Sequence, residues 1–211
     1  MPREAKEENL RLRSLLDEAT MSDGCRYHSR QVFVSDSRTL VYVSGAPGSG
    51  KTSLAVPLAA ELGYALLTKD RIKETLHDAL GAPEPDLAWS RRLSGAAMEL
   101  LWALAADAPA VVIEANFRPY SQYARAKLSG LAAQPVEVHC ACPPELAVKR
   151  YNARVTHPVH AVTTLQMEAM AEYDRPVGIG ALVAVDTTVT VDVNAVASAV
   201  RDCCDRMINL R

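Results

Sequence analysis

The stretch Gly45-Ala46-Pro47-Gly48-Ser49-Gly50-Lys51-Thr52 decides the fold of this chain. It matches in full the spacing of a phosphate-binding P-loop, in which a glycine and four residues precede Gly-Lys-Ser/Thr. The glycines let the backbone bend so that successive N–H groups point at phosphate oxygens, and the helix expected to follow directs its positive end at the same anion. We expect Gly45 through Ser53 to bind a nucleoside triphosphate, with Lys51 on the β- and γ-phosphates and Thr52 on Mg²⁺.

The length favours one domain, or one domain with an appendage, and we expect a cytoplasmic protein. The chain has 211 residues, of which 49% are hydrophobic, enough for one sizeable core. Its 23 basic and 25 acidic side chains give a net charge of -2, so no global attraction to nucleic acid or to an anionic membrane is expected. No apolar run approaches the roughly 20 residues that span a bilayer, and the charged stretch Met1 to Glu8 lacks the apolar centre of a signal peptide. The five cysteines fit no zinc-site spacing and are expected to be reduced.

Two regions differ in their pattern. Residues 1–39 are expected to form an N-terminal extension, with an amphipathic helix over 2–20 and a short strand at Gln31–Val34. That helix can pack on the domain or on a second subunit, which would give a homodimer. From Leu40 onward apolar β-type runs alternate with helical segments, which predicts βαβ units and a mainly parallel sheet covered on both faces. Strands are expected at 40–44, 64–68, 110–115, 136–142, 181–185 and 188–193, and helices at 50–62, 70–80, 86–106, 119–132, 144–155, 163–173 and 196–210.

Asp70 follows the second expected strand and opens a helix. In a parallel sheet the strand ends next to the P-loop converge on the γ-phosphate, so a carboxylate there can accept the proton of an attacking hydroxyl. Lys73, one turn later on the same side of the helix, can hold an anionic or polar group of the acceptor. The alternative is structural, because Asp is a favoured residue at a helix N-terminus.

A second carboxylate ends the apolar strand Val111-Val112-Ile113-Glu114. An apolar strand that ends in an acid has the form of a Walker B element, and such an acid holds Mg²⁺, often through water. Asn116 and Arg118 follow in the loop and can contact the acceptor. The alternative is a strand followed by ordinary polar loop residues.

Arg150 and Arg154 are four residues apart and share one helix face. They can close over the triphosphate and stabilise charge during phosphoryl transfer, whereas the alternative is a solvated basic helix. The two histidines of His157-Pro158-Val159-His160 have no acid or cysteine beside them in sequence, so they do not predict a metal site.

Five segments, taken in order, resemble a family of small P-loop kinases. The family includes the kinase domains of polynucleotide kinases, chloramphenicol phosphotransferase and zeta-toxin-like kinases, and many of its members are described as AAA-type ATPases. The segments are GAPGSGKT at 45–52, TKDRIKETLHDALG at 68–81, VVIEANFRP at 111–119, VHCACPPELAVKRYNAR at 138–154 and VAVDTT at 183–188. The resemblance covers roughly residues 40–205.

The resemblance implies a P-loop NTPase fold with three α/β/α layers and strand order 2-3-1-4-5. It implies a kinase domain over 40–211 with a small helical lid at about 144–176, ATP and Mg²⁺ as cofactors, and phosphorylation of a hydroxyl. By the same resemblance, the matching site residues are Asp70 as general base, Lys73 at a substrate-phosphate position, Arg150 and Arg154 as lid arginines, and Thr187 in the turn near the adenine.

Three functions are compatible with these residues. The first is an ATP-dependent kinase for a hydroxyl of a small molecule, such as an antibiotic, a sugar or polyol, or a nucleoside-like metabolite. The second is a polynucleotide 5′-hydroxyl kinase, for which the balanced charge gives no support. The third is a regulatory P-loop ATPase that binds a protein partner, an alternative that the extension 1–39 keeps open.

Overall fold

The computed structural model describes residues 38–81, 86–132, 135–160 and 164–208, all within the unit Ser35–Arg211. The helix expected at 2–20, the strand expected at Gln31–Val34 and the expected homodimer contact of the extension lie outside the described residues. None of the helices within the described ranges is long and apolar enough to cross a membrane.

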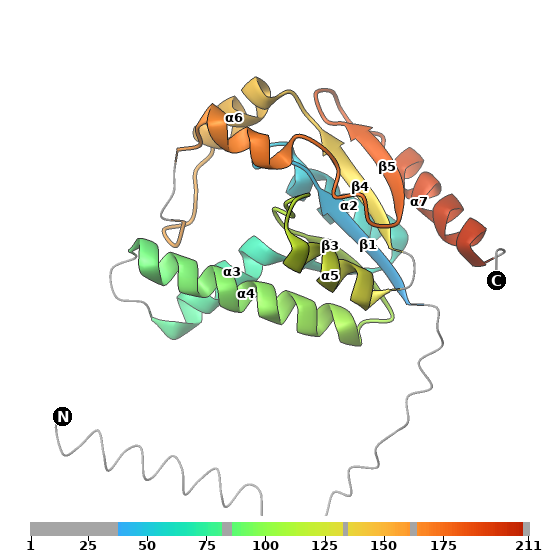
Figure 1. Ribbon diagram of the computed structural model, residues 1–211, viewed down its shortest axis with the longest axis horizontal. Coiled ribbons are helices and arrows are strands. Elements are labelled where there is room, and N and C mark those ends of the chain that lie inside the picture. The colour runs from blue at the N-terminus through green and yellow to red at the C-terminus, as the bar shows by residue number, and fades with distance from the viewer. Residues whose placement is uncertain (1–37, 82–85, 133–134, 161–163, 209–211) are drawn as a thin grey trace, which may run out of the picture. The chain divides into compact units, whose positions relative to one another are not determined.

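The described residues form a five-stranded parallel sheet in the order β2-β3-β1-β4-β5 (Figure 1). The strands are β1 (Thr39–Ser44), β2 (Ala65–Thr68), β3 (Ala110–Glu114), β4 (Val136–Ala141) and β5 (Ala181–Asp186). After their first residues, β1 and β3 are buried throughout, as near-continuous apolar runs in a parallel sheet require. The expected fold class and strand order are therefore confirmed.

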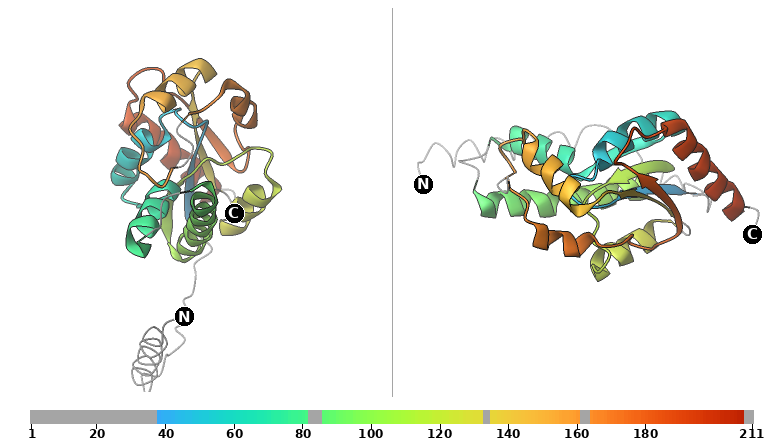
Figure 2. Two further views of the ribbon diagram at one scale, coloured as in Figure 1. Left: turned by 90° about the vertical axis from the view of Figure 1, so that its left-hand side faces the viewer. Right: turned by 90° about the horizontal axis from the view of Figure 1, so that it is seen from above.

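Helices cover both faces of the sheet, which lies between them in Figure 2. On one face α2 (Lys51–Leu62) and α7 (Val193–Ile208) share a core with the side chains of β1 and β4. On the other face α4 (Leu87–Asp107) and α5 (Gln122–Leu131) pack around Tyr42 and its neighbours. α3 (Lys69–Leu80) begins directly after β2 and packs against α4. Its first turn therefore lies at the carboxyl edge of the sheet, where the P-loop also lies.

The expected lid region contains one α-helix and one 3₁₀ helix. α6 (Pro144–Ala153) begins with Pro144, which suits a first helical turn, and lies beyond the carboxyl ends of β1 and β4 (Figure 1). The helix expected at 163–173 begins later than predicted, because within the described residues the chain forms a 3₁₀ helix, η1 (Met167–Tyr173). Met170 is the one buried residue of η1, so the segment lacks the buried face that packs an amphipathic α-helix.

The strand expected at 188–193 is also wrong. β5 ends at Asp186, whose Oδ1 accepts hydrogen bonds from the backbone N–H and the hydroxyl of Thr188 at 2.8 and 2.7 Å. An Asp side chain that binds the backbone two residues later closes a turn. The β-branched residues Val189 and Val191 line a cavity beside the P-loop instead, and Val193 begins α7.

A buried carboxylate on β4 binds the segment before β5 through hydrogen bonds. Glu137 on β4 is fully buried and accepts hydrogen bonds from the Tyr42 hydroxyl at 2.9 Å and from the N–H groups of Val177 and Gly178 at 2.8 Å. The Ser44 hydroxyl also donates to it. These donors compensate the buried charge. They lie 40 to 95 residues from Glu137, so no local sequence pattern predicts the network.

Candidate active site

The P-loop joins β1 to α2 with the backbone geometry that its glycines allow. Gly45, Gly48 and Gly50 have φ angles of +131°, +81° and +87°, and Gly50 is the N-cap residue of α2. A Cβ on Gly48 would lie 2.1 Å from the carbonyl oxygen of Ala147 in α6. Only glycine therefore fits between this loop and the lid helix.

Lys51 is the first residue of α2, and its side chain returns over the loop. Its ammonium donates a hydrogen bond to the Ala46 carbonyl over 2.8 Å, and the Ser49 N–H donates to the same oxygen over 3.1 Å. Lys51 is only 5% exposed. Burial lowers the pKa of Lys51, and the nearby Glu114 carboxylate opposes that shift. A phosphate in the loop would compensate this buried positive charge.

Thr52 and Glu114 meet where a metal ion is expected. The Thr52 hydroxyl donates to Glu114 Oε2 over 3.1 Å and so joins the start of α2 to the end of β3. Burial raises the pKa of Glu114, and the charge of Lys51 opposes this shift. A hydroxyl and a carboxylate are oxygen ligands of the kind that Mg²⁺ takes in nucleotide sites, so these residues fit the metal, directly or through water.

Asp70 lies in the first turn of α3, where β2 ends. Its Oδ1 accepts a hydrogen bond from the Lys69 ammonium over 3.0 Å. Burial raises the pKa of Asp70, but the charge and hydrogen bond of Lys69 outweigh it and hold the pKa below its usual value. The N-cap residue of α3 is Thr68, so helix capping does not account for Asp70.

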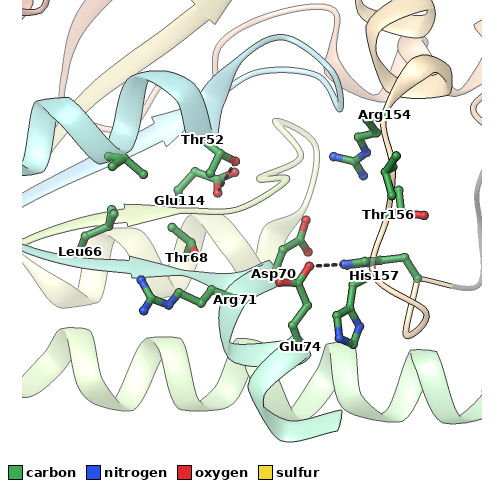
Figure 3. A pocket seen from close by; sticks show the side chains of 13 residues that line it. Thr52, Leu66, Thr68, Asp70, Arg71, Glu74, Glu114, Arg154, Thr156 and His157 are labelled. Atoms are coloured by element: carbon green, nitrogen blue, oxygen red, sulfur yellow. Dashed lines mark hydrogen bonds and ion pairs between the residues drawn. The ribbon is translucent and has the colours of Figure 1, made fainter. Parts of the chain in front are cut away.

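The two lid arginines have different surroundings. Arg150 Nη1 donates to the Thr187 carbonyl over 2.9 Å, which ties α6 to the segment after β5. Arg154, the C-cap residue of α6, has its guanidinium carbon 4.1 Å from the centre of the Tyr151 ring. Figure 3 shows this guanidinium directed into the space between the lid and the sheet.

The described residues enclose three adjoining cavities around these groups. The P-loop cavity, about 240 Å³, is lined by Pro47, Gly48, Gly50, Lys51, Thr52, Ser53, Asp70, Glu114, Asn116, Arg150 and Arg154. The β5 cavity, about 380 Å³, is lined by Gly50, Ser53, Leu54, Arg150, Thr187, Val189, Thr190, Val191 and Val193. The lid cavity, about 560 Å³, is lined by Thr52, Val56, Leu66, Thr68, Asp70, Arg71, Glu74, Glu114, Arg154, Val155, Thr156, His157 and His160 (Figure 3).

Shared side chains connect these cavities in a row. Gly50, Ser53 and Arg150 line both the β5 cavity and the P-loop cavity. The residues that line both the P-loop cavity and the lid cavity are Thr52, Asp70, Glu114 and Arg154. These four are among the residues expected to hold the metal, to act as base and to stabilise the transferring group, and the fold brings them together.

Lys73 lies elsewhere. Its ammonium is buried between α3 and α4, where it donates to the Ser90 hydroxyl over 2.7 Å, and it lines none of the three cavities. Burial, together with the charge of Lys69, lowers the pKa of Lys73 to about 8. Three residues correspond to about 300° of rotation around a helix, so the side chains of Lys73 and Asp70 point in directions about 60° apart. This offset directs Lys73 towards Ser90 of α4. Lys73, expected to hold a group of the acceptor, therefore lies outside these three cavities.

The two polar residues of the loop after β3, Asn116 and Arg118, lie in different surroundings. Asn116, expected to contact the acceptor, lines the P-loop cavity and not the lid cavity. Arg118 lines none of the three cavities; its Nε lies 2.8 Å from Glu172 Oε2 and donates to the Tyr173 hydroxyl over 3.4 Å. Arg118 thus connects the loop to η1.

Acids and histidines that are distant in sequence meet beside Asp70. His160 Nε2 lies 2.9 Å from Glu74 Oε1, and His157 Nε2 lies 3.2 Å from Asp78 Oδ1. The acidic partners that the sequence does not place beside these histidines therefore come from α3. The spacing of Asp70, Glu74 and Asp78 by four residues does show in the sequence and predicts one acidic helix face.

The parallel sheet, the P-loop after its first strand and the lid above it define a P-loop kinase fold. The chain belongs to the AAA_33 family, described as an AAA domain, whose sequence profile matches residues 40–176. No curated protein matches the chain.

Solved structures of kinases are also similar to this chain. The chain is similar to a protein of Chloroflexus aurantiacus J-10-fl that bears a provisional assignment as a kinase, with 28% identity, a TM-score of 0.67, and coverage of 79% of this chain and 98% of that one. It is similar in fold to shikimate kinase from Acinetobacter baumannii, with 16% identity, a TM-score of 0.52, and coverage of 79% and 93%. The resemblance to small P-loop kinases is confirmed.

Proposed function

We propose that the protein is an ATP-dependent kinase that transfers the γ-phosphate to a hydroxyl of a small molecule. The observation that supports this most strongly is that Asp70 lines both the P-loop cavity and the lid cavity. A carboxylate at this junction stands between a phosphate donor and a second cavity of about 560 Å³, which falls in the range of small-molecule sites. We expect the reaction in the cytoplasm, where ATP is supplied.

The donor groups of the P-loop fit ATP with Mg²⁺. The first N–H groups of α2 and the Lys51 ammonium would bind phosphate oxygens, and Thr52 with Glu114 would hold the metal. When bound, Mg²⁺ supplies positive charge that neutralises the β- and γ-phosphates during transfer. The β5 cavity, with its valines and with Thr187 fixed by Arg150, would take the adenine.

In this reaction the acceptor oxygen forms a bond to the γ-phosphorus while the bond to the β,γ-bridging oxygen breaks. Asp70 binds the hydroxyl and takes its proton. The low pKa of Asp70 makes it a weak base, so its main contribution is to orient the hydroxyl, as a loose transition state requires. Lys51 and Arg154 would stabilise the charge on the transferring group and on ADP.

The two alternative functions have less support. A polynucleotide kinase needs cations beside the acceptor hydroxyl for neighbouring phosphates, whereas Lys73 is buried against Ser90 and Arg118 is paired with Glu172. A regulatory ATPase has no use for a second cavity at Asp70.

The test is ADP formation with Mg·ATP and a panel of hydroxylated metabolites and antibiotics, with the products identified by mass spectrometry. Stimulation by an acceptor that becomes heavier by one phosphate would support the kinase. Hydrolysis that no acceptor stimulates, but that a protein partner changes, would favour the regulatory ATPase.

A further inference from the structure

A second carboxylate faces the lid cavity one helical turn after Asp70. Asp70 and Glu74 are four residues apart on α3, both line this cavity, and Figure 3 shows them side by side. One turn separates them by about 5–6 Å along the helix. Two hydrogen-bond acceptors at this spacing can bind two polar groups of one small molecule.

Within the part of the chain that the structure describes, protein donors reach one oxygen of each carboxylate. Lys69 donates to Asp70 Oδ1 at 3.0 Å, and His160 Nε2 contacts Glu74 Oε1 at 2.9 Å. Among the residues that the structure describes, no protein group donates to Asp70 Oδ2 or Glu74 Oε2. These two oxygens therefore remain for hydroxyl or ammonium donors of a ligand.

His160 fixes the position of Glu74. The imidazole comes from the segment that follows α6, its side chain is 12% exposed, and it also lines the lid cavity. A carboxylate held in this way loses little conformational freedom when it binds a ligand, so its hydrogen bond to the ligand costs less entropy.

Of the nearby cations, Lys69 and Lys73 lie outside the lid cavity, whereas Arg71 and Arg154 line it. Lys73 is directed to Ser90, and Lys69 is bound to Asp70 and does not line the cavity. Figure 3 shows the Arg71 side chain extending away from Asp70 and Glu74. Arg154 is assigned to the phosphates under the proposed function. An anionic group placed beside Glu74 would therefore meet like charge.

We propose that Glu74, held by His160, determines acceptor specificity and selects a polyhydroxylated acceptor without negative charge, of the neutral polyol or amino sugar class. One acceptor hydroxyl binds Asp70, and a second hydroxyl or an ammonium binds Glu74. Val56, Leu66 and Val155 supply apolar surface for the C–H groups of such a molecule. This inference rests on the proposed function.

The test compares three matched acceptor panels with Mg·ATP: neutral polyols and sugars, amino sugars, and sugar acids. The wild-type protein should phosphorylate members of the first two panels and not the third. In Glu74→Gln the KM for the acceptor should rise by about tenfold or more, since a charged hydrogen bond is lost, while the KM for Mg·ATP stays within about twofold. His160→Gln, which keeps a donor for Glu74, should lose less than His160→Ala.

Asp78→Asn is the matched control. Asp78 lies one further turn along α3 and pairs with His157 but does not line the cavity, so its loss should leave the acceptor KM unchanged. A preference for sugar acids, or an unchanged acceptor KM in Glu74→Gln, would overturn the inference and leave the kinase proposal intact. ADP formation that no panel stimulates would contradict both.

Discussion

The Thr52 hydroxyl donates a hydrogen bond to Glu114 Oε2 over 3.1 Å, although the two residues are 62 positions apart in the chain. Parallel pairing of β1 with β3 brings them together, because the P-loop leaves β1 at the edge where β3 ends in Glu114. The contact marks the place where a metal ion would bridge the P-loop helix and the sheet.

Glu114→Gln tests this metal position. Glutamine keeps an oxygen for Thr52 but removes the charge, so the Mg²⁺ concentration needed for half-maximal ADP formation should rise by about tenfold or more. ATP binding measured by calorimetry in EDTA should change little. An Mg²⁺ dependence equal to that of the wild-type protein would contradict the assignment of Glu114.

Gly48→Ala tests the contact between the P-loop and the lid. The added Cβ would lie 2.1 Å from the Ala147 carbonyl oxygen, so α6 and the loop must separate. We expect the affinity for Mg·ATP to fall by about tenfold or more. The control is Gly63→Ala, where φ is +70° but no atom lies within 4 Å of the added Cβ. It should cost about 1–2 kcal/mol of stability and leave ATP affinity intact. Equal ATP affinities in both variants would exclude close packing at Gly48.

Lys73→Met tests whether Lys73 is a buried cation of α3 rather than a substrate ligand. Burial, together with the charge of Lys69, lowers the pKa of Lys73 from its ordinary 10.5 to about 8. The folded state therefore disfavours the ammonium form. The resulting loss of folding stability is complete below pH 8, decreases between pH 8 and pH 10.5, and is absent above pH 10.5. The variant should be more stable than the wild-type protein at pH 7, and the difference should shrink towards about pH 10.

Urea unfolding of both proteins at the two pH values measures this difference, and acceptor phosphorylation should persist in the variant. A variant that is less stable at pH 7, or a difference that does not depend on pH, would contradict this description of Lys73.

The sequence predicts most of the fold because its signals are local. Glycine spacing at Gly45 and the apolar runs of the central strands are read over a few residues, and parallel pairing follows from their alternation with helices. The errors have physical causes. The run 188–193 has β-branched residues but is turned away from the sheet by Asp186, and η1 buries only Met170 although most of its residues are apolar.

The sequence predicts the position of a site residue when that position follows from the end of a neighbouring strand. It does not predict the position when a residue distant in sequence decides it. Asp70 and Glu114 follow strands, so their position at the carboxyl edge is expected. The position of Lys73 depends on which helix face α4 covers. Glu74 meets His160, 86 residues away, and both line the lid cavity. Such pairings need the tertiary structure.

The central claim is that Asp70 directs γ-phosphate to an acceptor hydroxyl. The most direct test compares the transfer of labelled γ-phosphate from ATP by the wild-type protein and by Asp70→Asn. The account expects the wild-type protein to place the label in an organic acceptor. Asp70→Asn should lose about 100-fold or more of this transfer while it still binds Mg·ATP, because the hydroxyl loses its base and its orientation. Label found only in inorganic phosphate, at the same rate in both proteins, would contradict the account.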